Sequence, residues 1–478
     1  MSKKLLLITL IAISSIYSNA QVAATIDFGQ VKQIIDGFGV STAWHGTISE
    51  KEADIAFGNS TSEQLGLNIL RVRIDPSSSN WVTEKMNAAK AKSRGALILA
   101  TPWTPPAYMK TNNNAVGGEL LPTQYVAYAE HLKDFCKYLG NVDVVSLQNE
   151  PNITVGYESC TWSAAQMLEF CKTNAPAIGK PVMAPEAYNF AYSTSDPILN
   201  DPIACANIQY VGGHLYGTTT RSYPLAVTKG KKLWMTEFAY NPDSIGTCMT
   251  MAKDILDCLN GNMNAFVYWY LRQPGCNIIN TDGTLKLKGY TLAQFSKFIR
   301  PGYYRVSATY QPNSKIYLVA FKGSTQDVLV AVNQNTVAKT QVYNFKNMNI
   351  MSASKFVTSD TKRLTNTETI TATNNSFTDN LDARSITTYV IKRTPSAINE
   401  TPVADINIFP NPAEDFIQLS TTDNVKSVNI FNLQGQKIQI FNNLVIPTLD
   451  ISSLQCGTYV IQVSLINGAE KRMKFFKK

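Results

Sequence analysis

Short apolar runs alternate with longer amphipathic stretches from residue 34 to about residue 301. Stretches with helical spacing lie between the runs, for example at residues 123–139 and 163–174. Strands that alternate with helices form parallel sheets, and seven or eight such units over about 270 residues predict an α/β chain with a closed (β/α)8 barrel. The apolar runs that we expect to be its strands are residues 69–74, 96–100, 142–147, 182–185, 208–214, 232–236 and 265–270.

The pattern changes after residue 302. Apolar runs here alternate with polar turns and show no helical period, which indicates an antiparallel β-sandwich over residues 303–392. Residues 21–35 also contain a strand-like segment and could pair with this later domain, which leaves residues 36–302 for the barrel. The runs that we expect to form the sandwich are residues 315–321, 327–332, 340–345 and 385–391.

The two ends of the chain have their own character. Residues 1–20 combine Lys3 and Lys4, a short apolar run and the small-residue end Ser18-Asn19-Ala20, as in a secretory signal peptide; a buried N-terminal helix is the alternative. Residues 393–403 are polar with two prolines and are predicted to be a linker. Residues 404–478 are predicted to be a small, separate all-β module.

Composition narrows the function. The net charge of +8 is spread over 478 residues without a long basic run, so nucleic acid is not an expected partner. Only three histidines are present and no Cys-x-x-Cys pair occurs, so we expect no metal and no other cofactor. A chain that is rich in Tyr and only 16% charged suits an extracellular protein that binds uncharged polar ligands.

Two glutamates each follow an apolar strand. Glu150 ends the run at residues 144–150, where Pro151 stops the strand, and Glu237 follows residues 233–236. A single glutamate at a strand end is usually a solvated or ion-paired loop residue. Two of them in one barrel are expected at the same end, because the C-terminal ends of parallel strands gather there.

Paired carboxyl groups fit the cleavage of a glycosidic bond. One protonates the leaving oxygen and the other faces the anomeric carbon, and a separation of about 5–5.5 Å corresponds to retention of configuration. An amide beside the acid can bind the sugar 2-hydroxyl, and Asn149 is placed for that role.

Longer motifs carry a more specific resemblance. Asn149-Glu150-Pro151 and Glu237 resemble the catalytic pair of a large clan of barrel glycosidases. With five further segments, residues 25–392 resemble glycoside hydrolase family 30, and above all its bacterial endo-xylanase branch. Those segments are residues 36–39 (DGFG), 70–75 (LRVRID), 102–110 (PWTPPAYMK), 214–217 (HLYG) and 268–272 (YWYLR).

The resemblance implies a barrel with a fused β-sandwich, a retaining mechanism, and Glu150 as acid/base with Glu237 as nucleophile. It further implies that three tryptophans line the cleft and stack on sugar rings, although they could instead be core aromatics. These are Trp44, Trp103 and Trp269.

Polar residues near the pair receive implied roles as well. Arg71 or Arg73 would hold the nucleophile ionised by its opposite charge. Tyr216 would donate to Glu237, and His214 would orient the site. Purely structural roles for Tyr216 and His214 are the alternatives.

This chain differs from the family pattern at two loops. Glucuronoxylan-specific members carry a second arginine directly after the one that matches Arg272, and this chain has Gln273 there, followed by Pro274 and Gly275. Because a neutral amide cannot replace an ion pair with a glucuronate branch, we expect relaxed or altered glucuronate dependence. Arg272 itself would bind substrate or be structural. The second loop differs at Ala239, just after the nucleophile.

The C-terminal module resembles the type A sorting domain of proteins exported by the type IX secretion system. The resemblance rests on residues 409–412 (FPNP), on Gly457-Thr458-Tyr459 and on the basic end of the chain. It implies export machinery as a partner and a product that is secreted or attached to the cell surface; a small carbohydrate-binding module is the alternative.

The sequence therefore predicts a secreted, monomeric retaining endo-β-1,4-xylanase whose substrate is plant xylan. Arabinoxylan, xylan chain ends and β-glucan remain alternative substrates within the same chemistry. A non-catalytic glycan-binding protein of the same fold is the alternative from another class.

Overall fold

The computed structural model describes residues 22–394 except 325, and residues 406–478 except 421–424, 434, 443–447 and 466–469. The chain divides into two compact units, Met1–Thr394 and Pro395–Lys478. The predicted signal peptide at residues 1–20 and the linker at 393–403, apart from its first two residues, lie outside the described residues.

The barrel predicted from the alternating pattern is confirmed. Eight parallel strands close on themselves, and the strand absent from the predicted set is the first one. That strand contains Gly37 and Gly39, which weaken its apolar signal, and a Cβ on Gly39 would lie 2.7 Å from the carbonyl oxygen of Ile69. The barrel strands are β2 (Gly37–Ser41), β3 (Ile69–Ile74), β4 (Leu97–Pro102), β5 (Val144–Ser146), β6 (Val182–Ala187), β7 (Tyr210–His214), β8 (Lys232–Glu237) and β9 (Ala265–Tyr268).

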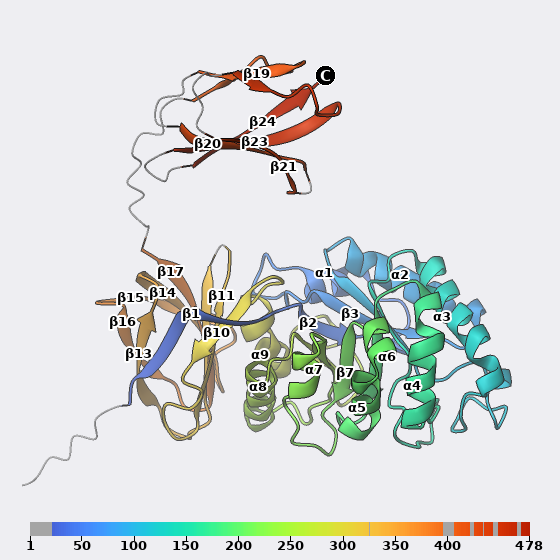
Figure 1. The fold of residues 1–478 in the computed structure, drawn as a ribbon. Coiled ribbons are helices and arrows are strands. Elements are labelled where there is room, and N and C mark those ends of the chain that lie inside the picture. The colour runs from blue at the N-terminus through green and yellow to red at the C-terminus, as the bar shows by residue number, and fades with distance from the viewer. Residues whose placement is uncertain are drawn as a thin grey trace, which may run out of the picture. The chain divides into compact units, whose positions relative to one another are not determined.

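Amphipathic helices cover the outside of the barrel (Figure 1). In α3 the buried Tyr128, Leu132, Phe135 and Leu139 follow helical spacing and face the strands, and the helix ends at Gly140, whose φ of 79° is left-handed. The helices are α1 (Glu50–Phe57), α2 (Trp81–Lys92), α3 (Tyr125–Leu139), α4 (Ala164–Thr173), α5 (Tyr192–Asn200), α6 (Pro202–Asn207), α7 (Pro224–Thr228), α8 (Ile245–Asn260) and α9 (Leu287–Ser296), with short 3₁₀ turns at Ser78–Asn80, Ala107–Met109, Pro122–Gln124 and Ala175–Ile178.

Apolar side chains fill the barrel interior toward the N-terminal ends of the strands. A compact cluster there includes Leu99, Met183 and the fully buried Trp234. The indole Nε1 of Trp234 donates to Asp36 Oδ2 at 2.8 Å, which satisfies its polar atom. Polar groups for chemistry are therefore confined to the other end, where the strands finish.

A nine-stranded sheet is fused to the barrel as the predicted side sandwich. Its pairings are antiparallel except for β1 with β13, which is parallel, and β1 also pairs with β10. The sheet folds over its own core, because the rings of Tyr343 in β13 and Tyr389 in β17 lie 5.4 Å apart. The strands in spatial order are β15 (Thr365–Thr371), β14 (Ile350–Thr358), β17 (Ser385–Arg393), β12 (Asp327–Asn333), β11 (Ile316–Lys322), β10 (Tyr304–Ala308), β1 (Ala24–Ile34), β13 (Lys339–Lys346) and β16 (Ser376–Leu381).

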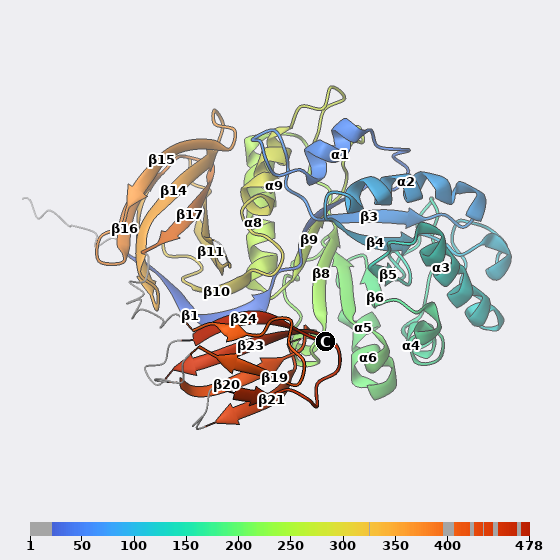
Figure 2. The same ribbon diagram turned by 90° about the horizontal axis from the view of Figure 1, so that it is seen from above.

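Helices α8 and α9 lie between the barrel strands and this sheet (Figures 1 and 2). Apolar residues of β11 and β12, including Phe321 and Val330, belong to the same core cluster as the barrel helices. The side-chain amide of Gln294 in α9 donates to Thr358 Oγ1 at 2.9 Å, and the backbone carbonyl oxygen of Gln294 accepts from Thr388 Oγ1 at 2.7 Å. One continuous core thus joins barrel and sandwich.

The described residues of the C-terminal unit form two small sheets over a core of their own. The segment Phe409-Pro410-Asn411-Pro412 begins in the first strand, and Gly457 begins the long central one. The strands are β18 (Ile408–Phe409), β19 (Phe416–Leu419) and β22 (Thr448–Asp450) in one sheet, and β21 (Lys437–Asn442), β20 (Val425–Phe431), β23 (Gly457–Leu465) and β24 (Glu470–Lys477) in the other.

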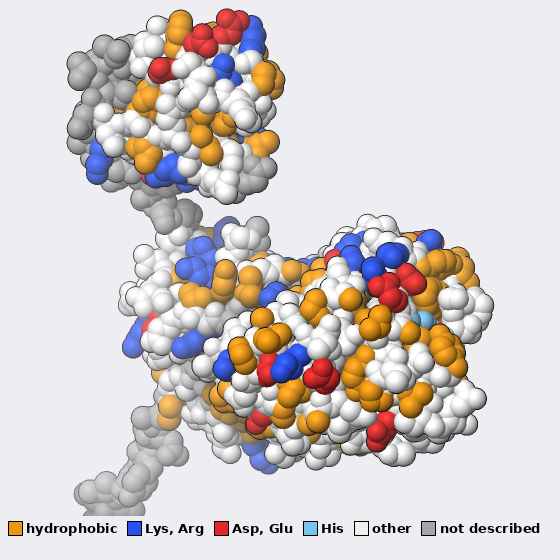
Figure 3. Space-filling view, turned by 45° about the vertical axis from the view of Figure 1, so that its right-hand side comes forward, with side chains coloured by type: hydrophobic (Ala, Val, Ile, Leu, Met, Phe, Trp, Pro, Cys, Tyr) orange, Lys and Arg blue, Asp and Glu red, His pale blue; other side chains and the backbone are white. Residues whose placement is uncertain are grey.

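Charged side chains are sparse among apolar and uncharged polar ones on the face shown in Figure 3. Within the described parts of the chain, no helix has the length and apolar character needed to cross a membrane.

The joint core predicts that barrel and sandwich unfold together. Phe321→Ala removes a fully buried ring at the junction and should lower the free energy of unfolding by about 3–5 kcal/mol in one transition shared by both parts. Denaturant titration followed by tryptophan fluorescence, which reports the barrel, and by far-UV circular dichroism measures this. Met351→Ala on the partly exposed face of β14 is the control, with a change within about 0.5 kcal/mol. Separate transitions for the two signals would contradict the shared core.

Candidate active site

A cleft of about 550 Å³ opens at the C-terminal ends of the barrel strands. Aromatic rings and a few polar groups form its walls, as in a site that binds a polar ligand with apolar faces. Its lining residues are Trp44, Trp103, Glu150, Tyr157, Tyr188, Tyr216, Glu237, Trp269 and Gln273.

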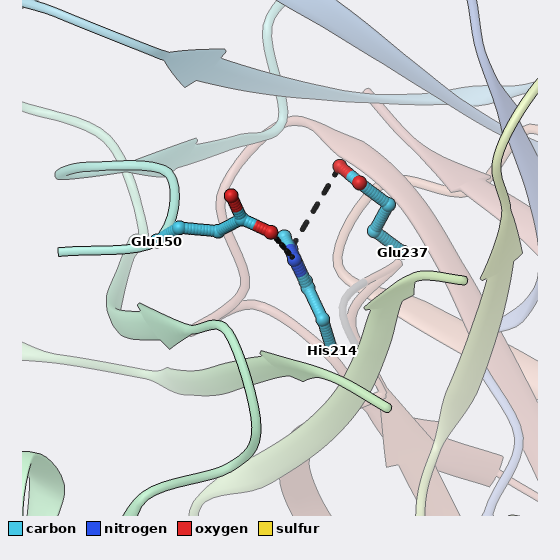
Figure 4. A group of neighbouring side chains, drawn as sticks. All are labelled: Glu150, His214 and Glu237. Atoms are coloured by element: carbon cyan, nitrogen blue, oxygen red, sulfur yellow. Dashed lines mark hydrogen bonds and ion pairs between the residues drawn. The ribbon is translucent and has the colours of Figure 1, made fainter. Parts of the chain in front are cut away.

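The two glutamates face each other in this cleft. Glu237 is the last residue of β8, the seventh barrel strand, and Glu150 follows β5, the fourth. One carboxylate oxygen from each, together with a ring nitrogen of His214, lie within 4.8 Å of one another (Figure 4).

The backbone at Glu150 is unusual. Its φ of 47° is left-handed, which is costly for a residue with a Cβ and persists where the surroundings hold it. The backbone N–H of Glu150 donates to the backbone carbonyl oxygen of Glu186 at 2.9 Å, and the backbone N–H of Asn149 donates to that of Pro102 at 2.8 Å. Neighbouring strands β4 and β6 thus fix the direction of the Glu150 side chain.

Arg71 of β3 lies beneath the pair and is fully buried. Its guanidinium donates to Glu237 Oε2 at 2.7 Å and to Asn149 Oδ1 at 2.6 Å, and it forms an ion pair with Glu186 at 3.0 Å. Burial acts to lower the pKa of Arg71, but the charges of Glu186 and Glu237 outweigh it and raise the pKa. Arg71 therefore stays charged and contacts the carboxylates rather than the open cleft.

Glu186 is a buried carboxylate that the sequence prediction missed. Burial acts to raise its pKa, but Arg71 and His214 overcome that effect and lower it to about 2. Thr101 also donates to it at 3.1 Å. Its position near the end of β6 repeats the pattern of Glu237, which is the signal in the sequence, but Pro185 within β6 predicts an earlier end of the strand.

His214, at the end of β7, is fully buried between the carboxylates. Its Nδ1 lies 2.9 Å from Glu150 Oε1, and its Nε2 lies 3.5 Å from Glu186 and 4.0 Å from Glu237. Burial acts to lower the pKa of His214, but the charge of Glu237 and the hydrogen bonds to Glu150 and Glu186 raise it to about 9. The ring is therefore protonated at neutral pH.

The pKa values of the two cleft glutamates shift in opposite directions. Burial raises the pKa of Glu237, although His214 and Arg71 oppose the shift. Burial also acts to raise the pKa of Glu150, but hydrogen bonds from His214 and Tyr157 and the charge of His214 outweigh it and lower the pKa. Arg71 or Arg73 is the residue that the resemblance expects to keep Glu237 ionised. Arg71 is the one that contacts Glu237, and its charge opposes the effect of burial on the pKa without overcoming it.

Two tyrosines complete the hydrogen bonds of the pair. Tyr216 donates to Glu237 Oε1 at 3.1 Å, and Tyr157 donates to Glu150 Oε2 at 2.9 Å. Tyr157 comes from the loop after β5, where no periodic pattern marks it in the sequence.

The three tryptophans meet on one wall of the cleft. The rings of Trp44 and Trp103 lie 4.8 Å apart, and those of Trp103 and Trp269 lie 5.8 Å apart. Trp44 is 49% exposed with a left-handed φ of 57°, whereas Trp103 is 2% exposed and lies 4.5 Å above the Arg71 guanidinium. Trp44 is thus the most accessible of the three faces.

Arg272 and Gln273 point to different places. Gln273 lines the cleft, whereas Arg272 forms an ion pair with Glu52 of α1 at 2.9 Å and lines a separate pocket. The side chain of Arg272 is therefore committed to α1 and does not line the cleft.

Glu150, His214 and Glu237 have the spacing of a metal-ligand set. Their ligand atoms already have partners, however, since Arg71 donates to Glu237 and His214 is paired with Glu150. A protonated imidazole offers no lone pair to a metal. These three side chains therefore favour binding of a proton over binding of a metal ion.

A closed (β/α)8 barrel with two facing glutamates at strand ends, in an aromatic cleft, defines the class of barrel glycoside hydrolases. The chain is 36% identical over 391 residues to the glucuronoxylanase XynC of Bacillus subtilis, covering 77% of this chain and 92% of that protein. The crystal structure of a glycoside hydrolase family 30 subfamily 8 xylanase from Clostridium acetobutylicum matches with a TM-score of 0.75 and 41% identity, covering 77% of this chain and 99% of that one.

A family 30 endoxylanase from Clostridium papyrosolvens matches with a TM-score of 0.73 and 39% identity, covering 78% of this chain and all of that one. The chain therefore belongs to glycoside hydrolase family 30. Residues 407–478 match the family model described as a secretion system C-terminal sorting domain, so the chain carries a signal for secretion at its end.

The environment of His214 predicts a pH-dependent stability. Its pKa is about 9 in the folded protein and about 6.5 when unfolded, so its contribution is fully present below about pH 6.5 and is lost as the pH rises through 9. The loss should approach ~3 kcal/mol. Thermal unfolding of the wild type and of His214→Gln between pH 6 and 9.5 measures it, because titrating groups outside this site cancel in the difference. A difference that does not change with pH would contradict a protonated His214.

Proposed function

We propose that this protein is a secreted, retaining endo-β-1,4-xylanase. The observation that carries the proposal is the pair of glutamates, whose facing oxygens lie within 4.8 Å at the ends of the fourth and seventh barrel strands. Retaining glycosidases hold their two carboxyl groups about 5–5.5 Å apart, whereas inverting ones need about 6.5–9.5 Å to admit a water.

Glu150 is the proposed acid/base and Glu237 the proposed nucleophile. Glu237 attacks the anomeric carbon while Glu150 protonates the leaving oxygen, which gives a glycosyl-enzyme and a shortened chain. Glu150 then removes a proton from water, which attacks the same carbon and frees Glu237. No metal or organic cofactor enters either step.

The hydrogen-bond partners support this division of roles. Glu237 is bound by Arg71, a permanent cation that strengthens its ionised form, whereas Glu150 is paired with His214, which can give and take a proton. The pKa directions of the unliganded pair are the reverse of what the roles require, so the roles rest on these partners. In the proposal, a proton stored on the His214–Glu150 pair moves onto Glu150 when bound substrate excludes water, because desolvation favours the neutral carboxyl.

Xylan is proposed as the substrate because the similar proteins are xylanases and because the cleft suits a neutral glycan. Trp44 has an accessible face that can stack on a pyranose ring, and Trp103 and Trp269 pack against it on the same wall of the cleft. Asn149 can bind the 2-hydroxyl of the sugar beside the nucleophile. Gln273 offers no charge to a glucuronate branch, and Arg272 is engaged by Glu52. We infer relaxed dependence on glucuronate, and we expect the enzyme to act as a monomer.

Separate variants of the two glutamates test their roles. Glu237→Ala should lose about 10⁵-fold or more of the activity on xylan, and added azide should give a glycosyl azide of inverted configuration. Glu150→Ala should keep fast glycosylation from aryl glycosides with good leaving groups, and azide should give the retained product. Proton NMR of the anomeric signals distinguishes the products. A retained product from Glu237→Ala and an inverted product from Glu150→Ala would reverse the two roles. Full activity of Glu237→Ala would refute the assignment of a nucleophile.

The cleft wall at Gln273 predicts the product pattern. Wild-type protein should cleave unsubstituted xylan and glucuronoxylan at rates within about tenfold of each other, which corresponds to roughly 1.4 kcal/mol, because no Lys or Arg is among the described residues that line the cleft. Gln273→Arg should shift cleavage toward glucuronate-bearing sites. Product sizing on glucuronoxylan, unsubstituted xylan, arabinoxylan and β-glucan measures both. Cleavage only beside glucuronate in the wild type would overturn relaxed dependence.

A further inference from the structure

Arg73, two residues after Arg71 on β3, does not reach the catalytic pair. Its guanidinium binds Glu158 in a fork, with Nη2 at 2.5 and 2.6 Å and Nε at 3.0 Å from the carboxylate, and it also pairs with Asp75. The side chains of Arg73 and Glu158 are only 11% and 23% exposed. A bidentate pair of this kind fixes both direction and distance between the two segments that carry it.

The residue before Glu158 is Tyr157, whose hydroxyl donates to Glu150 Oε2 at 2.9 Å. Tyr157 is 49% exposed, so packing alone leaves its ring free to move. The next residue, Glu158, binds this loop to strand β3 through Arg73, beside a backbone bridge between Glu158 and Val116. The bridge holds the backbone of the loop, whereas the ion pair is the side-chain contact that ties it to β3 next to the tyrosine.

Arg73 also supports a second cleft residue. The ring of Trp44 lies 5.1 Å from the centre of the Arg73 guanidinium, within the range of a cation–π contact. Trp44 is half exposed and has a left-handed backbone, so this contact supplies part of its support. One guanidinium thus joins the loop after β2 to the loop after β5.

We propose that Arg73 and Glu158 are positioning residues of the active site, which hold the Tyr157 hydroxyl on Glu150 and the Trp44 ring on the cleft wall. The inference rests on the proposed role of Glu150 as acid/base. A bond from Tyr157 stabilises the ionised form of Glu150, so losing it raises the pKa of that carboxyl.

A double-mutant cycle tests the proposal. Tyr157→Phe should move the alkaline limb of the kcat/KM profile on xylan upward by roughly 0.5–1 pH unit and lower the plateau by roughly fivefold. Glu158→Gln, which keeps size and loses charge, should move the limb in the same direction. Adding Glu158→Gln to Tyr157→Phe should move it no further, because both act through one bond. Independent, additive shifts, or no shift in Glu158→Gln, would overturn the proposal.

Two further variants separate positioning from stability. Arg73→Lys keeps the charge but loses the fork, and it should give a smaller shift together with a raised KM from the loosened Trp44. Lys92→Ala removes an ion pair with Asp143 at the opposite end of the barrel, where Nζ lies 2.7 and 2.8 Å from the carboxylate. That control should lower the melting temperature without moving the pH profile. A profile that moves as far in Lys92→Ala would show a general effect and overturn the proposal.

A crystal structure of Glu158→Gln gives a readout that needs no activity. The Tyr157 hydroxyl should leave hydrogen-bonding distance of Glu150, and an unchanged bond would overturn the positioning role even if the wild type hydrolyses no xylan. Absence of hydrolysis by the wild type, with the bond lost in the variant, would refute the proposed function alone.

Discussion

The guanidinium of Arg71 lies in the barrel without access to water, and a buried charge of this kind is tolerated only when opposite charges compensate it. Its partners are Glu186, Glu237 and Asn149, which come from three other strands or strand ends. Arg71 can be buried only because the order and register of the barrel strands bring these groups to one point. The same requirement places Glu237 and the segment that carries Glu150 opposite each other.

The charges of this cluster also determine where its protons lie. Arg71 and the protonated His214 supply two positive charges against Glu150, Glu186 and Glu237. Glu186 is held ionised, so the remaining titration is shared among His214 and the two cleft glutamates. Protonation of this site is therefore a property of the group, and a ligand that displaces water can move a proton within it without taking one from bulk solvent.

The sequence predicted the barrel, the side sandwich and the C-terminal β module because each has its own hydrophobic period. Glu150 and Glu237 could be found because strand ends in a barrel share one face. Strand β2 was missed because its glycines suppress the apolar signal, and Glu186 because Pro185 resembled a strand end. The direction of Arg272 and the bond of Tyr157 were beyond sequence reasoning, since a side-chain rotamer and an aperiodic loop leave no pattern in the residues.

The structure separates chemistry from recognition in physical terms. Arg71, Glu186 and Glu237 lie within strands whose neighbours fix them through backbone ladders and a packed apolar base, so their geometry tolerates little change. Trp44, Tyr157 and Gln273 lie in loops and hold their places through a few side-chain contacts. Substitutions in those loops change the cleft wall at small cost to the fold, because loop backbone contributes little to the core. A chain can therefore keep the glutamate pair and its buried partners intact while a loop residue such as Gln273 changes.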